Sequence, residues 1–214
     1  STSPVEAGAP VTLALTSGAP KNLDFTTTDG AAIPQALLGN VYQGLVALSD
    51  SGEIVPVLAK SWTVSPDGLT YTFDLVDNAT FSNGDPFTAS DVKYSFEQVK
   101  SDAWTISLKS KMDVVDTIEA VSPTQVKVTL KTPSNSWLYD MTTRVGAIFD
   151  KNAGGDLATK AVGTGPFVVS EFIPDTSLTL TARDDYWGTP PQVQTVTFQY
   201  NNDVNAQIAG MLSG

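Results

Sequence analysis

Alternation of apolar and polar positions is the dominant pattern along this chain. Val11, Leu13 and Leu15 alternate with polar or small residues, and from 71 to 75 an aromatic or aliphatic residue stands at every second position. Because successive side chains of a strand point to opposite faces, this period of two predicts strands with one buried face. The turn sequence Ser-Pro-Asp-Gly at 65–68 predicts that the strands around it form a hairpin. Further strands are expected at 114–121, 126–130, 167–172, 178–181 and 193–200.

A spacing of three to four predicts the helices. Leu37, Val41 and Leu45 favour a helix over 33–45, and Val92, Phe96 and Val99 share one face of another. Thr88 can cap that second helix, with Asp91 at its third helical position in a capping box. Shorter helices are expected at 104–112 and 135–141, and a last amphipathic helix at 203–212. Strands and helices are interspersed without a strict βαβ period, which indicates a mixed α/β fold.

Composition removes several classes of function. The chain of 214 residues carries 23 acidic and 12 basic side chains, a net charge of -11, and has no Lys/Arg cluster, so we expect no nucleic-acid partner. It has no cysteine and no histidine. A Ser-His-Asp triad, a cysteine nucleophile and a metal site with His or Cys ligands therefore cannot form. We expect no cofactor, no metal site and no catalytic residues.

Several motifs occur in the same order and spacing as in one known family. The chain resembles the family 5 bacterial extracellular solute-binding proteins, which include dipeptide-, oligopeptide- and nickel-binding proteins of ABC importers. The resemblance covers nearly all of residues 11–214. The segments that carry it are 41–46 (VYQGLV), 54–62 (IVPVLAKSW), 66–73 (PDGLTYTF), 81–92 (FSNGDPFTASDV), 162–167 (VGTGPF), 183–188 (RDDYWG) and 196–213.

The resemblance implies a fold and a division of the chain. It implies an α/β, periplasmic-binding-protein-like lobe of type II, similar to cluster C, with a mixed sheet and an inserted accessory subdomain. Relatives are about twice as long because a second lobe follows, so this chain is expected to be the N-terminal portion, with the second lobe absent. By analogy, 1–10 is a linker, 11–36 together with 162–214 form the ligand-contacting lobe, and 37–161 form the accessory subdomain.

One loop is the first candidate for ligand contact. Thr26, Thr27, Thr28 and Asp29 match a loop that faces the cleft in similar proteins. Their hydroxyl and backbone groups can hydrogen-bond a ligand, and Asp29 can meet a peptide ammonium group. The alternative is an ordinary polar loop in which Asp29 caps the following helix. Phe25 stands where the family often has proline, which changes the expected shape of this loop.

Two further residues are candidates because of the resemblance. Trp104 falls where relatives place an aromatic side chain at the cleft, and its alternative role is packing at a helix end. Arg144 falls where nickel-binding relatives use an arginine against a ligand carboxylate, and its alternative is a surface ion pair with Asp140. Two other motifs are expected to be structural: Gly163-Thr164-Gly165 leads into a strand rather than a phosphate-binding helix, and Tyr186-Trp187 is expected to pack in the scaffold.

The predicted function is that of a receptor. The resemblance implies the substrate-binding component of an ABC importer, a monomer and not an enzyme, which captures a small extracellular solute, foremost a di- or oligopeptide, and delivers it to a membrane permease. It implies an extracytoplasmic location, periplasmic or lipid-anchored to the outer face of the cell membrane. A receptor for a nickel chelate or another small solute is the alternative within the family. Two alternatives of other classes are a carbohydrate-active enzyme with paired carboxylates and an interaction module without a ligand.

Overall fold

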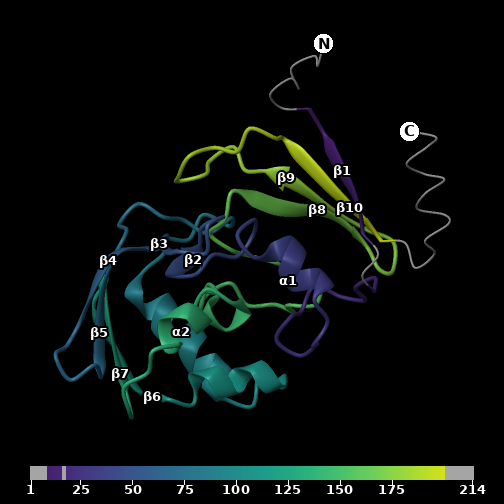
Figure 1. The fold of residues 1–214 in the computed structure, drawn as a ribbon. Helices are drawn as coiled ribbons and strands as arrows, with labels where there is room; N and C mark the ends of the chain where they lie inside the picture. Colours follow the sequence, from purple (N-terminus) through teal and green to yellow (C-terminus); the bar gives the residue numbers. More distant parts are fainter. Residues whose placement is uncertain (1–8, 16–17, 201–214) are drawn as a thin grey trace.

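The fold consists of two four-stranded sheets, an antiparallel two-stranded sheet (46–48 with 54–56), and short helices and loops (Figure 1). It is seen in a computed structural model that describes residues 9–15 and 18–200. The strands are β1 (Val11–Leu15), β2 (Val46–Leu48), β3 (Ile54–Pro56), β4 (Ala59–Val64), β5 (Thr70–Leu75), β6 (Val115–Ser122), β7 (Gln125–Leu130), β8 (Phe167–Ile173), β9 (Ser177–Ala182) and β10 (Thr195–Tyr200). The α-helices are α1 (Ala32–Leu37), α2 (Ala89–Lys100) and α3 (Trp137–Asp140), and the 3₁₀ helices are η1 (Ser107–Met112) and η2 (Arg144–Gly146).

The first sheet joins the two ends of the described chain. Its order is β1-β10-β9-β8, with β1 parallel to β10 and the other pairs antiparallel. Val11 lies opposite Val196 and Leu15 opposite Tyr200, so segments from opposite ends of the sequence are hydrogen-bonded neighbours. The whole segment from α1 to the start of β8 is therefore inserted between two strands that belong to one sheet.

The second sheet lies within that insertion. Its order is β4-β5-β7-β6, every pair is antiparallel, and α2 packs against β6 and β7. The inward side chains of β5 are buried, as are Val126 and Val128 of β7 and the apolar face of α2. Trp137 fills the centre of this core, with ring centroids 4.9 Å from Tyr71 and 6.4 Å from Phe96.

Most predicted elements are confirmed. The hairpin around residues 65–68 is β4-β5, and Gly68 takes a positive φ of 75° in its turn. The helix expected after Thr88 is α2, and Asp91 closes the predicted capping box by accepting the Thr88 amide at 2.9 Å. The five further strands predicted by alternation are β6 to β10. The short helices at 104–112 and 135–141 are present in part, as η1 and α3.

The helix predicted over 33–45 is wrong beyond Leu37. Leu38 is extended, with ψ at 128°, and Gly39 has a φ of 83°, a left-handed conformation that ends the helix. The Gly39 amide then donates to the Tyr42 carbonyl in a turn. Val41 and Leu45 are buried as predicted, but they enter the core from this turn and the segment after it.

Other predictions lie partly outside the described residues. The helix expected at 203–212 and most of the linker expected at 1–10 belong to this group. Within residues 9–15 and 18–200, no helix is both long and apolar enough to cross a membrane.

Candidate functional site

Asp24 organises the loop that contains the candidate threonines. Its Oδ1 accepts the Thr26 amide at 2.8 Å and the Thr26 hydroxyl at 2.6 Å, while its Oδ2 accepts the Thr27 hydroxyl at 3.1 Å. The Thr28 hydroxyl donates to the Asp24 backbone carbonyl at 2.8 Å. The three hydroxyl protons are thus used within the loop, where they link residues 24–28 to one another.

Arg144, from η2, holds the same loop from its other end. Its Nη1 donates to the carbonyls of Phe25 at 3.2 Å and Thr28 at 2.8 Å, and its Nη2 donates to that of Gly30 at 3.2 Å. The residue is only 7% exposed. The arginine therefore ties residues 25–30 to a segment more than a hundred positions later in the chain.

The charge of Arg144 has no close counter-ion in the described part of the chain. No carboxylate there lies within 4.0 Å of the guanidinium, and burial lowers the pKa of this group while the more distant Asp29 raises it. A guanidinium stays protonated in proteins and has five N–H donors. Three of them meet loop carbonyls, so Nε–H and one Nη2–H have no partner among the described residues.

Trp104 lies beneath the loop. Its residue is 2% exposed and its ring meets Phe25 edge-on, with centroids 6.1 Å apart and planes at 70°. The next residue, Thr105, donates its amide to the Thr26 carbonyl at 3.1 Å. The ring packs in the apolar environment that the alternative interpretation expected, and stacking of this ring on a ligand stays a prediction.

The fold brings all six candidate residues to one place, and it overturns two of the alternatives. Asp29 is exposed and does not cap α1, which has Ala31 at its N-cap and no side-chain cap. Asp140 does not pair with Arg144; the cation within 4.0 Å of its carboxylate is Lys111. Neither Asp29 nor Arg144 is therefore used in the contact that its alternative interpretation assigned to it.

Two residues that shape the loop were missed. Asp24 accepts most of the internal hydrogen bonds, as an Asp two residues before a Thr commonly does in a turn. Phe25, noted only as a departure from proline, is 1% exposed and lies 5.3 Å from Tyr42 and 5.8 Å from Phe149, measured between ring centroids. The large ring anchors the loop where the family often has proline.

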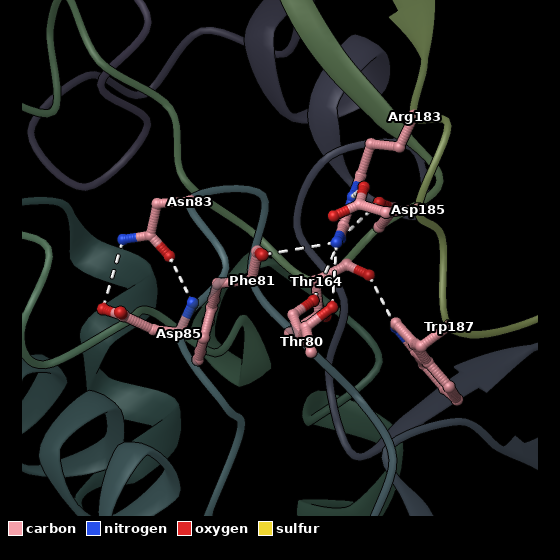
Figure 2. A network of polar contacts seen from close by, with 9 residues as sticks. Thr80, Phe81, Asn83, Asp85, Thr164, Arg183, Asp185 and Trp187 are labelled. Carbon is pink, nitrogen blue, oxygen red and sulfur yellow. Dashed lines mark hydrogen bonds and ion pairs between the residues drawn. The ribbon is translucent and has the colours of Figure 1, made fainter.

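A second buried arginine joins the insertion to the first sheet (Figure 2). Arg183 follows β9, and its Nη atoms donate to the carbonyls of Thr80, Phe81 and Gly165 at 2.9 to 3.3 Å and to the Thr80 hydroxyl at 3.0 Å. Its Nε–H meets the carboxylate of Asp185 at 3.2 Å. All of its donors are used, so its role is to hold the scaffold.

We call the contacts of Arg183 with residues 80–81 and 165, together with those of residues 163–164 and 186–187 nearby, the seam, and these further contacts explain the other motifs. Trp187 donates its indole N–H to the Thr164 carbonyl at 2.8 Å (Figure 2). The Tyr186 hydroxyl accepts a hydrogen bond from Gln43 at 2.9 Å. A Cβ added to Gly163 would stand 2.0 Å from the Val41 carbonyl oxygen. The glycines of the Gly-Thr-Gly motif allow its backbone to lie close to that of residues 40–42. The Tyr-Trp pair packs in the scaffold as expected.

A first sheet that joins the two ends of the described chain, an insertion that carries a second sheet, and a candidate ligand loop held by Arg144 of that insertion define a lobe of the periplasmic-binding-protein type. Residues 53–214 match the model of the "Bacterial extracellular solute-binding proteins, family 5 Middle". The chain belongs to this family of solute-binding proteins, and the predicted fold class is confirmed.

Individual relatives agree with that membership. "Di/tripeptide-binding protein 2" of Pseudomonas aeruginosa is 29% identical over 93% of this chain and 43% of its own length. The "Nickel-binding periplasmic protein" of Escherichia coli is 32% identical over 81% of this chain and 34% of its own. The Helicobacter pylori periplasmic binding protein DppA, solved in complex with the peptide STSA, superposes with a TM-score of 0.88 at 26% identity, over 98% of this chain and 46% of its own. This chain thus spans less than half the length of each.

Proposed function

We propose that this chain supplies the N-terminal part of the substrate-binding component of an ABC importer, and that the captured solute is a di- or oligopeptide. The observation that carries the proposal is the charge of Arg144, which has no counter-ion within 4.0 Å among the described residues and is held in a hydrogen-bonded loop. Two of its N–H donors are free of protein partners in the described part of the chain, next to the exposed Asp29. A peptide has a carboxylate that can bind Arg144 and an ammonium group that can interact with Asp29.

Each candidate residue has a role in this proposal. Arg144 binds the solute carboxylate and Asp29 attracts its ammonium group. The backbone groups of 26–28, together with the lone pairs of the three hydroxyls, contact the peptide main chain, which suits solutes with varied side chains. Trp104 supports the loop from below and presents a ring edge to the solute.

The division of labour along the chain belongs to the same proposal. Residues 11–36 and 162–214 form the ligand-contacting lobe, and 37–161 form the accessory subdomain. Closure of a second lobe over the solute completes the site and creates the surface that a membrane permease reads. The protein is a monomer without catalytic activity, outside the cytoplasm, in the periplasm or on a lipid anchor. The similarity to peptide-binding and periplasmic relatives supports this part.

Binding of matched peptides tests the proposal. The purified full-length protein, including the second lobe that the proposal requires, is titrated with di- and tripeptides whose C-terminus is either a free carboxylate or an amide, with melting temperature and calorimetry as readouts. A solute at about 100 times its Kd stabilises a protein by about 2.7 kcal/mol, which raises its melting temperature by several degrees. We expect the free carboxylates to raise the melting temperature and the amides to do so much less.

Two outcomes contradict parts of the proposal. If no peptide shifts the melting temperature or releases heat, peptide capture is wrong. If peptides bind and the amides bind as tightly as the acids, the protein is a peptide receptor but Arg144 does not read the carboxylate. Lys131→Met removes a positive charge from an exposed residue outside the loop and should keep the preference for free carboxylates.

A further inference from the structure

The chain contains two Asp-Gly sequences, Asp29–Gly30 and Asp67–Gly68. In such a sequence the amide nitrogen of the glycine can attack the aspartate Cγ, because glycine has no Cβ to obstruct the approach. A C–N bond forms, a C–O bond of the protonated carboxyl breaks and one water leaves, which gives a cyclic imide. Water then opens the imide at its main-chain carbonyl carbon and leaves isoaspartate, whose main chain runs through Cγ. Whether a folded protein allows this reaction depends on what holds the two reacting groups.

Both reacting groups of Asp67–Gly68 are held in the β4-β5 turn. The Gly68 amide donates to the Ser65 carbonyl at 2.8 Å, and Asp67 Oδ1 accepts the Leu69 amide at 3.0 Å. Hydrogen bonding from the Ser65 hydroxyl, then from the Leu69 amide, lowers the pKa of the Asp67 carboxyl. This carboxyl therefore stays ionised, which makes its Cγ the poorer electrophile, and the Gly68 nitrogen is fixed by its own hydrogen bond.

The reacting groups of Asp29–Gly30 are not held in this way. Neither the Asp29 carboxyl nor the Gly30 amide has a hydrogen-bond or ion-pair partner among residues 9–15 and 18–200. Both residues are exposed, and no atom lies within 4 Å of a Cβ placed on Gly30. The carboxyl and the amide can thus turn toward each other without losing a hydrogen bond.

We infer that Asp29–Gly30 is a site of spontaneous isoaspartate formation, and that Arg144 restrains the reaction. The Arg144 guanidinium donates to the carbonyls of Thr28 and Gly30, which flank Asp29 in the chain. These hydrogen bonds oppose the backbone rotation at Asp29 that ring closure requires. Isoaspartate also adds one carbon to the main chain between the two carbonyls, so their spacing no longer matches the guanidinium.

Ageing of the purified full-length protein in solution tests the inference. Peptide mapping that separates the isomers by chromatography gives the isoaspartate fraction at Asp29 and at Asp67 in the same sample. We expect isoaspartate to accumulate several times faster at Asp29 than at Asp67 in the folded protein, and at similar rates in denaturant, where only the shared Asp-Gly sequence remains. Equal rates in the folded protein, or a difference that persists unchanged in denaturant, would overturn the inference.

Three variants test the glycine and the arginine separately. Gly30→Ala adds a Cβ beside the attacking nitrogen where the fold has room for it, and should slow the reaction at Asp29 several-fold. Arg144→Met removes the restraint and should speed up the reaction at Asp29 and not at Asp67, whereas Lys131→Met should change neither rate. If Gly30→Ala leaves the rate unchanged, the site is wrong, and if Arg144→Met and Lys131→Met behave alike, the restraint by Arg144 is wrong.

Isoaspartate formation goes beyond the proposed function, and only its response to a solute rests on that function. A bound peptide whose ammonium group contacts Asp29 should slow the reaction there. If a saturating peptide leaves the rate at Asp29 unchanged, the isoaspartate site stands and the proposed contact of Asp29 with the solute is wrong. A protein that binds no peptide and still reacts faster at Asp29 than at Asp67 would keep this inference and discard peptide capture.

Discussion

The two buried arginines use the same chemistry to different ends. Arg183 and Arg144 both donate to three main-chain carbonyls of segments that lie far away in sequence or in another element. Arg183 also bonds the Thr80 hydroxyl and the Asp185 carboxylate, so all five of its N–H groups are used. Arg144 has neither a carboxylate within 4.0 Å nor, in the described residues, partners for two of its donors.

That difference separates a scaffold residue from the residue that we propose binds the solute. A guanidinium with every donor bonded and a carboxylate alongside has nothing left for a ligand. A guanidinium that is held by neutral carbonyls keeps its full charge and two directed donors, which match the fork of a carboxylate. Substitutions at the two sites should therefore have different effects. Those at the Arg183 seam should mainly lower stability, and those in the Arg144 loop should lower stability less and solute binding more.

The largest expected effect is that of Arg183→Met. The Arg183 side chain is 2% exposed, and its loss leaves the carbonyls of Thr80, Phe81 and Gly165 without their donor. Removing one partner of a buried charged network costs about 3–5 kcal/mol. Denaturant unfolding should show this loss. Arg183→Lys keeps the charge but not the forked set of donors, so its stability should lie between those of Arg183→Met and the parent protein. A loss under ~1 kcal/mol for Arg183→Met would contradict the stabilising role of Arg183.

Gly163→Ala tests the same seam without touching a charge. The added Cβ would stand 2.0 Å from the Val41 carbonyl oxygen, which belongs to backbone and cannot swing aside. We expect a loss of about 2–3 kcal/mol in unfolding free energy. Gly30→Ala is the matched change in the Arg144 loop, where no atom lies within 4 Å of the new Cβ and φ is not positive. It should change stability by less than ~0.5 kcal/mol, and an equal loss for both would contradict the comparison.

Local chemistry made much of the scaffold predictable. Alternation located the strands of both sheets because successive side chains of a strand point to opposite faces. The spacing of Thr88 and Asp91 located the start of α2 because the two residues bond each other. The helix over 33–45 failed for the converse reason. Val41 and Leu45 are buried by distant elements, so their step of four reflects the core and not a helix, and the turn signal of Gly39-Asn40 outweighed it.

The proximity of the candidate residues could be predicted from the sequence, but their contacts could not. Resemblance placed Thr26–Thr28, Trp104 and Arg144 in one region, and the fold brings them together. That Arg144 donates to loop carbonyls depends on the path of a backbone more than a hundred residues away, which no local pattern reports. Asp24 was missed because its partners are determined by the shape of the loop itself.

Arg144→Met is expected to have a smaller effect on stability than either change at the seam. Three charge-assisted hydrogen bonds are lost, but the carbonyls of Thr28 and Gly30 belong to exposed residues and can bond to water instead. We expect a loss of about 1–2 kcal/mol by denaturant unfolding. Hydrogen exchange of the amides at 25–30 should rise while that of β5 and β7 does not. If hydrogen exchange rose throughout the protein and the loss of unfolding free energy equalled that of Arg183→Met, the loop would be part of the scaffold.

Asp185→Asn sharpens the comparison with the smallest effect. Hydrogen bonding to Arg183, then its charge, lowers the pKa of the Asp185 carboxyl, although the side chain is 67% exposed. A carboxyl whose pKa is lower in the folded than in the unfolded protein stabilises the fold above its unfolded pKa of about 3.9, and this contribution is lost as pH falls through the folded value. The melting temperature of Asp185→Asn should thus lie slightly below that of the parent at pH 7 and converge with it in acid. Asp184→Asn, at an exposed neighbour with no hydrogen bond to a described residue, should show no such convergence. If Asp185→Asn shows none either, Arg183 is held by its carbonyls alone, and the absence of a carboxylate beside Arg144 no longer distinguishes the two arginines.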